Sequence, residues 1–156
     1  MKYLKKTFLI LTLILMPLFI TGCGNIEGSL DEIMGKLYEN IPEDERPMML
    51  TNSEVTEETV EYFLGTKDIE YEEALASEPG IGSIAHSVVL VRTKDNADVN
   101  ALMDKISNNI NPRKWVCVGV EEEDVIIKNK GNLIILIMIE DEKTRDKIVE
   151  SFNNLK

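Results

Sequence analysis

A thiol, an imidazole and a group of cations are the side chains in this sequence whose chemistry could support a function. His86 is the single histidine, and Cys117 is the one cysteine beyond residue 23. A cysteine and a histidine can act as nucleophile and base if both lie on one face within hydrogen-bonding distance. Val116 and Val118 flank Cys117, which instead predicts a small buried side chain with an inert thiol. We expect His86 on another strand, as a hydrogen-bonded histidine at a sheet edge or under a helix.

Arg113, Lys114 and Trp115 form the most promising cluster for binding. Two cations beside an aromatic ring could hold an anionic or carbohydrate group through charge and stacking. Arg92, at the end of an expected strand, could converge on the same place or be an ordinary strand-end charge. The alternative for the cluster is that Trp115 belongs to the core and that the cations neutralise nearby carboxylates.

The acidic run Glu121–Asp124 is the remaining group that could bind an ion. It lacks the spaced Asp or Asn residues and the glycine of a dedicated calcium loop, so a solvated turn is expected. The sequence contains no zinc pattern, phosphate-binding glycine loop, Ser-His-Asp arrangement or cofactor fingerprint. We therefore predict no metal site, no cofactor and no enzymatic activity.

The first residues of the chain are typical of an exported protein. Lys2, Lys5 and Lys6 precede an apolar run from Phe8 to Ile20. As a helix that run would reach about 20 Å, which is less than the roughly 30 Å of a bilayer core. A basic start followed by a short apolar run indicates a signal peptide rather than a permanent membrane span.

The run ends in the tetrad Ile20-Thr21-Gly22-Cys23, which is similar to the lipobox of bacterial lipoproteins. In such proteins the cysteine thiol receives lipid, and cleavage occurs directly before it. We therefore expect a signal peptide over residues 1–22, lipid attachment at Cys23 and a short tether over residues 23–28. A cleaved signal with an incidental cysteine and an uncleaved anchor are the alternatives.

Removal of that signal peptide leaves a strongly acidic chain. The full sequence has 17 Lys and Arg and 28 Asp and Glu residues, and without the three lysines near its start the counts are 14 and 28, a net charge of −14. Such a surface is repelled by nucleic acid and by anionic lipid. We expect no nucleic-acid partner, and membrane contact through the lipid on Cys23 alone. An envelope protein, or an anionic or wall ligand, is the partner that we expect.

A single domain over residues 29–156 must position these groups. Its first part, residues 29–77, looks helical: Ser29 and Glu32 form a capping-box pattern at the start. Two further short helices are expected. One would open at Ser53 or Thr56, contain Val60, Phe63 and Leu64 and stop at Gly65, and the other would cover residues 68–77.

The second part of the domain supplies a sheet. We expect strands over residues 84–93, 115–120, 125–129 and 133–139, with one helix after Asp98 and another after Asp141. Residues 133–139 are apolar on both faces, which indicates a strand covered on both sides. The order β-α-β-β-β-α after a helical lead-in predicts an α+β fold, in which the N-terminal helices pack on a small mixed or antiparallel sheet.

The chain resembles an uncharacterised family of small lipoproteins of anaerobic Gram-positive bacteria, known as a domain of unknown function. The resemblance covers roughly the whole mature chain and is carried by Ser-Val-Val-Leu-Val-Arg at 87–92, Pro-Arg-Lys-Trp-Val-Cys-Val-Gly at 112–119 and Lys-Gly-Asn-Leu at 130–133. It implies a location and a fold, but no reaction, substrate or catalytic residue.

Three classes of function are compatible with the sequence. The preferred one is a non-catalytic, membrane-anchored binding or assembly module on the extracytoplasmic face of the cell membrane. A small ligand-capture lipoprotein is the second, and a thiol enzyme or hydrolase using Cys117 and His86 is the third. A polar pocket containing Arg92, Arg113 and Trp115 would favour ligand capture, whereas a flat apolar patch would favour a protein partner.

Overall fold

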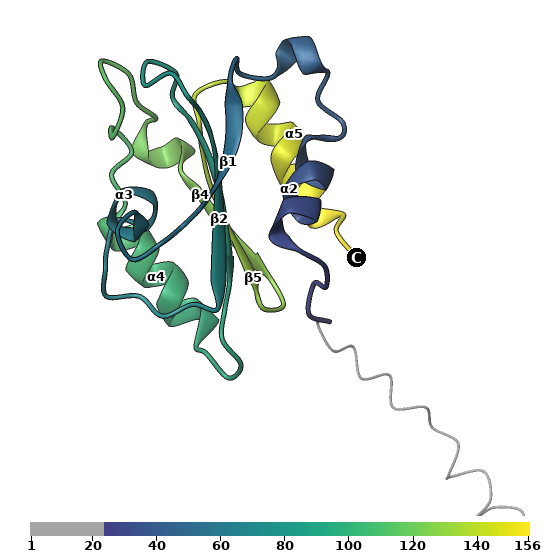
Figure 1. Ribbon diagram of the computed structural model, residues 1–156, viewed down its shortest axis with the longest axis vertical. Coiled ribbons are helices and arrows are strands. Elements are labelled where there is room, and N and C mark those ends of the chain that lie inside the picture. The colour runs from purple at the N-terminus through teal and green to yellow at the C-terminus, as the bar shows by residue number, and fades with distance from the viewer. Residues whose placement is uncertain (1–23) are drawn as a thin grey trace, which may run out of the picture.

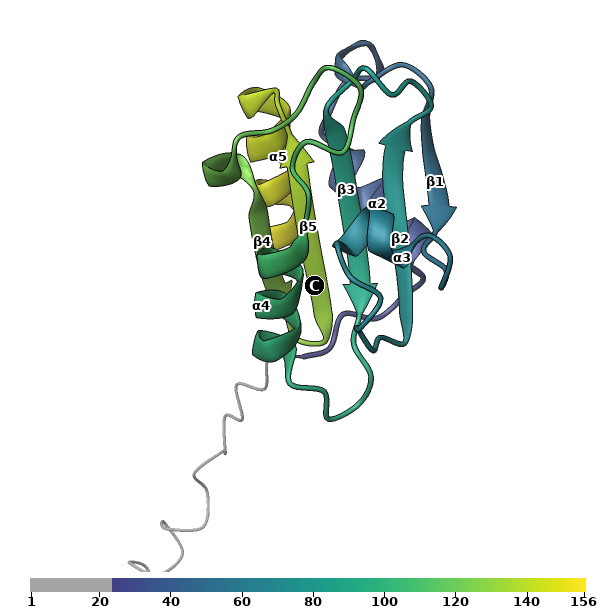
Figure 2. The ribbon, with the colours of Figure 1, turned by 90° about the vertical axis from the view of Figure 1, so that its left-hand side faces the viewer.

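The computed structural model describes residues 24–156, which form a five-stranded antiparallel sheet between two layers of helices (Figures 1 and 2). The predicted signal peptide (residues 1–22) and Cys23 lie outside the described residues. No helix within residues 24–156 is long and apolar enough to cross a bilayer.

The helices and strands confirm the α+β class predicted from the sequence. The helices are α2 (Leu30–Tyr38), α3 (Val60–Leu64), α4 (Val99–Asn109) and α5 (Glu142–Asn153), with short 3-10 turns η1 (Glu43–Glu45) and η2 (Glu122–Asp124). The strands are β1 (Leu50–Glu54), β2 (Glu73–Pro79), β3 (His86–Arg92), β4 (Ile126–Lys130) and β5 (Leu133–Ile139). They lie in the order β1-β2-β3-β5-β4, and all neighbouring strands are antiparallel.

Side-chain caps fix the starts of the three longer helices. The Ser29 hydroxyl accepts a hydrogen bond from the Glu32 amide at the start of α2, and the Glu32 carboxylate accepts one from the Ser29 amide. Asp98 and Asp141 cap α4 and α5 in the same way, by accepting from the amide three residues on. Each cap satisfies a backbone donor that has no partner within the helix.

The sheet separates two hydrophobic cores. Helices α2 and α5 cover one face, and α3 and α4 cover the other (Figure 1). Alternate residues of β3 and β5 point to opposite cores, and both strands are buried throughout. Burial of each large apolar side chain contributes about 1.5–3 kcal/mol, so these two strands are the centre of the stable structure.

In the first half of the domain one predicted helix is wrong, and one strand was not predicted. Residues 68–77 were expected to form a helix, but β2 runs from Glu73 to Pro79 between β1 and β3. Residues 50–54 form β1, although they carry no alternation of apolar and polar side chains. Their sheet pairing outweighs local propensity, because strand formation depends mainly on cross-strand neighbours.

The predicted strand over residues 115–120 is also wrong. Trp115 and Val120 are buried, but Val116 and Cys117 between them are exposed. The chain turns at Cys117, whose φ of 63° lies in the left-handed region, and the Val120 amide closes the loop on the Pro112 carbonyl at 2.9 Å. A Cβ on Gly119 would lie 2.8 Å from the Arg113 side chain, so this close approach requires glycine.

Candidate functional site

Arg92 holds the beginning of the described chain against the sheet. Its guanidinium donates to the carbonyl oxygens of Ile26 (2.5 Å) and Gly28 (2.6 Å) and to the Glu73 carboxylate (2.7 Å). Ile26 itself is buried in the core under α2. Residues 26–28 therefore pack on the domain, which shortens the tether expected over residues 23–28. All of these interactions are internal, and together they form a structural clamp.

Lys114 lies at the other end of β3, inside a box of aromatic rings. Its ammonium nitrogen lies 4.3 Å from the ring centroid of Tyr62, 4.9 Å from that of Phe63 and 5.3 Å from that of Trp115. It donates to the Glu78 carboxylate and, at 3.4 Å, to the Ser87 hydroxyl. The Lys114 side chain is 4% exposed, and this burial lowers its pKa, while Glu78 acts in the opposite direction.

The predicted binding cluster is therefore not assembled as a ligand site. Arg113 is exposed and pairs with Glu121 at 2.7 Å, Trp115 is buried, and Lys114 is occupied by Glu78 and the rings. The convergence of Arg92 on these residues is wrong, because Arg92 lies at the opposite end of β3. The alternative, with Trp115 in the core and the cations paired with carboxylates, describes the structure.

Cys117 and His86 do not form a nucleophile and base pair. His86 lies on the α2 side of the sheet, where its Nε2 lies 2.7 Å from the Tyr38 hydroxyl. Cys117 belongs to the loop beside the α3 and α4 core and is exposed. The prediction that the thiol is buried is wrong, because the turn at Cys117 directs it away from the sheet.

The acidic run at 121–124 forms the turn η2, and two of its carboxylates are already paired. Asp124 binds Arg145 at 2.9 Å, and Glu121 binds Arg113. Within residues 24–156, no group of three or more His, Cys, Asp or Glu side chains is arranged to hold a metal ion.

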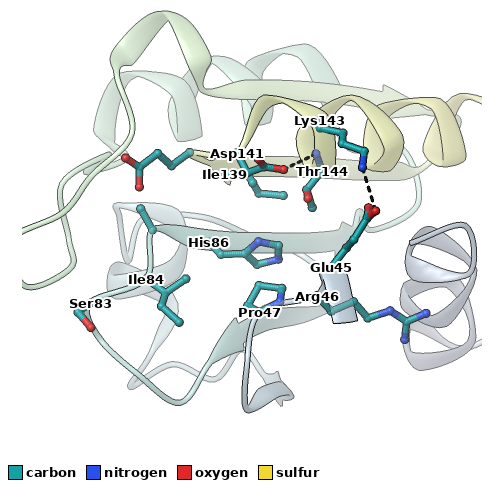
Figure 3. Close-up of a pocket in the computed structure, with 12 residues that line it drawn as sticks. Glu45, Arg46, Pro47, Ser83, Ile84, His86, Ile139, Asp141, Lys143 and Thr144 are labelled. Carbon is teal, nitrogen blue, oxygen red and sulfur yellow. Dashed lines mark hydrogen bonds and ion pairs between the residues drawn. The ribbon is translucent and has the colours of Figure 1, made fainter. Parts of the chain in front are cut away.

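A cleft of about 770 Å³, lined by both polar and apolar groups, lies at the end of the sheet where β3 begins and β5 ends (Figure 3). Three segments meet there: η1 with the residues that follow it, the chain leading into β3, and the start of α5. The lining residues are Glu45, Arg46, Pro47, Ser83, Ile84, Ala85, His86, Ile139, Glu140, Asp141, Lys143 and Thr144. No motif in the sequence predicts this cleft, because the residues that line it come from three segments far apart in the chain.

His86 is the titratable group at the inner wall of this cleft. It is 2% exposed, and burial lowers its pKa to about 4, although the nearby Asp141 carboxylate acts in the opposite direction. The imidazole is therefore neutral at pH 7, with one nitrogen occupied by Tyr38. Burial also raises the pKa of the Tyr38 hydroxyl, so both groups are uncharged.

Two of the charged groups at the rim of the cleft, Glu45 and Lys143, are paired with each other. Glu45 accepts hydrogen bonds from Lys143 and Lys147, each at 2.8 Å, and these bonds lower the pKa of its carboxyl group. Hydrogen bonding from the side chain and then from the amide of Thr144 lowers the pKa of Asp141; the amide bond is 2.8 Å long. No hydroxyl or thiol nucleophile is hydrogen-bonded to His86 among the described residues other than Tyr38.

Exposed apolar side chains gather at the same end of the domain. Met48, Met49 and Val116 are 70%, 66% and 68% exposed. All three flank the turn after β2: the Gly80 amide donates to the Met49 carbonyl, and the Val116 amide donates to the Gly82 carbonyl. We call these three residues the apolar tip. Met49 and Cys117 both have φ near 60°, a backbone strain that in proteins concentrates at binding and catalytic sites.

Comparisons of the chain with family models, curated proteins and solved structures found no match.

Proposed function

We propose that this protein is an exported lipoprotein, held in the membrane by lipid on Cys23, whose domain is a non-catalytic binding module for another envelope protein. The observation that carries the proposal is the position of the apolar tip at the end of the domain opposite to Gly24, the first described residue (Figure 1).

The Arg92 clamp supports this orientation. Because Ile26 and Gly28 are bound to Arg92, only Gly24 and Asn25 separate the clamped segment from Cys23. Two residues span about 7 Å at most. Gly24 and Asn25 also lie against the β4–β5 turn, where a Cβ on Gly131 would be 2.8 Å from the Gly24 carbonyl oxygen. An anchor at Cys23 would therefore keep this end of the sheet at the bilayer and hold the apolar tip away from it.

The apolar tip has the character of a protein interaction site. Exposed apolar patches with a polar surround often mark surfaces that another protein covers. Acidic residues flank this patch in the sequence: η1 comes shortly before Met48, and the run at 121–124 comes shortly after Val116. Methionine is suited to such a surface, because its unbranched side chain adapts to different partners.

Ligand capture is the second candidate function, and the cleft beside His86 is the observation that favours it. A volume of about 770 Å³ lies within the range of small-molecule sites. Glu45 at the rim, however, already pairs with Lys143 and Lys147, so a ligand that binds any of these three groups would have to compete with those ion pairs.

Two measurements in cells test the proposal. Cys23→Ala should abolish lipid labelling and release the domain from the membrane fraction. A photo-crosslinking residue placed at Met48 or Val116 should give discrete adducts with an envelope protein, whereas the same residue at Asn108, exposed on α4, should give none. Unchanged lipid labelling of Cys23→Ala would refute the anchor, and identical crosslinking from all three positions would refute the binding face.

A further inference from the structure

Strand β1 is an open edge of the sheet that lacks the usual protection. Four of its five residues are exposed, from Thr51 to Glu54 (Figure 2). The other edge strand, β4, carries Lys128 and Lys130, the charged residues with which proteins commonly block edge pairing. β1 contains no lysine, arginine or proline.

The hydrogen bonds at the two ends of β1 identify its free backbone groups. The Gly80 amide donates to the Met49 carbonyl, and the Val55 amide donates to the Ala74 carbonyl, each at 2.9 Å. In an antiparallel pair, residues alternate between those that bond to the neighbour and those that face away. Thr51 and Ser53 therefore bond to β2, while the N–H and C=O groups of Leu50, Asn52 and Glu54 face outward.

Charge and apolar surface indicate what would bind to this edge. Residues 51–58 carry Glu54, Glu57 and Glu58 and no cation, and Asp31 lies beside the strand, where it accepts a hydrogen bond from Asn52. Met48 and Met49 of the apolar tip directly precede β1. A segment that paired with β1 would thus meet carboxylates along the strand and apolar side chains at its start.

A second copy of this chain does not fit the edge. Antiparallel pairing of two β1 strands would place the two Gly24 ends at opposite ends of the joined sheet, so both copies could not be anchored in one leaflet. A two-fold axis along the strands would keep both anchors together. That symmetry, however, would place the outward N–H and C=O groups of Asn52 directly opposite the same groups of the second copy. Parallel strands can bond only when the outward groups of one strand lie between those of the other. The net charge of −14 after signal cleavage also opposes self-association.

We propose that β1 binds an extended, basic segment of an envelope protein, which adds a strand to the sheet and packs an apolar side chain on Met48 and Met49. This rests on the proposed function, and it names the binding mode and the chemistry of the partner. Backbone hydrogen bonds would supply much of the affinity, and the carboxylates beside β1 would select the charge.

The test uses the full-length protein in detergent micelles and a short synthetic peptide of alternating lysine and valine. A peptide of alternating glutamate and valine is the matched control. We expect the lysine peptide to bind at least about tenfold more tightly. Its binding should slow hydrogen exchange at the amides of Leu50, Asn52 and Glu54, while those of Thr51 and Ser53 are already protected without peptide.

Two variants separate edge pairing from general charge attraction. Asn52→Pro removes one outward N–H without removing a bond to β2, and it should weaken binding about tenfold. Asn52→Ala loses the contact with Asp31 but keeps the N–H, and it should bind within about twofold of the wild type.

Equal binding by all three proteins, or protection at other amides, would overturn the proposal. So would a peptide-independent dimer that protects the same three amides. Exchange in the wild-type protein decides the question even if Asn52→Pro does not fold, and a negative result would leave the Cys23 tests unaffected.

Discussion

The two ends of the sheet differ in how their backbone and charges are satisfied. At the end near Gly24, Arg92 binds two carbonyls and a carboxylate, and the β4–β5 turn lies against Gly24 and Asn25. At the far end, exposed apolar side chains surround the turn after β2. At the Gly24 end, polar groups are satisfied by contacts within the domain. At the far end, apolar side chains are exposed and have no partner among the described residues.

Both ends nevertheless contain a buried cation, and the two cations serve the fold rather than a ligand. Arg92 uses the fork geometry of the guanidinium to join three partners. Lys114 uses a compact ammonium group that three rings and Glu78 can surround. A cation beside an aromatic residue in the sequence therefore does not identify a ligand site. Here the cation binds the aromatic rings and a carboxylate of the same protein.

Lys114→Ala should have the largest effect on stability, because it removes the cation and leaves Glu78 partly buried without its partner. Breaking a buried ion pair on one side costs about 3–5 kcal/mol. Urea unfolding measures this loss. The double variant Lys114→Met with Glu78→Gln removes both charges and should recover most of it. A loss below about 1 kcal/mol for Lys114→Ala would show that the aromatic box is not closed.

Arg92→Ala should cost about 3 kcal/mol, because it leaves the carbonyls of Ile26 and Gly28 without their charged donor. Arg92→Lys keeps the charge but not the fork, and it should lie between the wild type and Arg92→Ala. Urea unfolding gives the free energies, and limited proteolysis shows whether residues 24–28 become accessible. If Arg92→Ala left both measurements unchanged, Arg92 would not be what holds residues 26–28 on the domain.

The burial of His86 should make the free energy of unfolding depend on pH between about 6.5 and 4. The pKa of His86 falls from 6.5 to about 4 on folding, so in this interval the unfolded chain binds a proton that the folded chain does not. The free energy of unfolding therefore decreases as the pH falls, by about 1.4 kcal/mol per pH unit and roughly 3 kcal/mol in total. Urea unfolding at a series of pH values should show this slope in the wild type and a flatter one in His86→Gln.

Cys117→Ala should have the smallest effect, within about 0.5 kcal/mol, because the exposed thiol fills no cavity. A maleimide should label the native protein about as fast as the denatured protein. Slow labelling of the native protein alone would mean that the loop covers the thiol and that the open end is less open than its side-chain exposures indicate.

The sequence predicts the strands and helices that bury apolar side chains, and it misses the elements whose pairing is set by neighbours. The faces of β3, the β4–β5 hairpin and the caps at Ser29, Asp98 and Asp141 follow from local pattern alone. β2 contains Ala74, Leu75 and Ala76, which favour helix, and only the strands on either side determine its conformation. β1 is polar because it lies at an edge, so it carries no alternation to detect.

At the candidate sites, too, the sequence predicts the buried residues and misses the features set by contacts between distant segments. Trp115 was recognisable as a residue of the core, but the alternation from Trp115 to Val120 concealed a turn that exposes Val116 and Cys117. Pro112 and Gly119 near its two ends were the available signal, since both residues favour turns. The cleft at His86 could not be predicted, because the residues that line it are brought together only by the closing of the sheet.

The Arg92 clamp also bears on the order in which the chain folds. Its donor and the Ile26 carbonyl are 66 residues apart in the sequence, and the β4–β5 turn that lies against Gly24 is more distant still. Contacts between residues so far apart form late, because closing a long loop costs chain entropy before any contact is gained. Residues 24–28 should therefore stay extended and accessible until most of the domain has formed. Under the export and lipid attachment proposed above, that delay would give the enzymes acting at Cys23 time to reach it before the folded domain closes over the neighbouring residues.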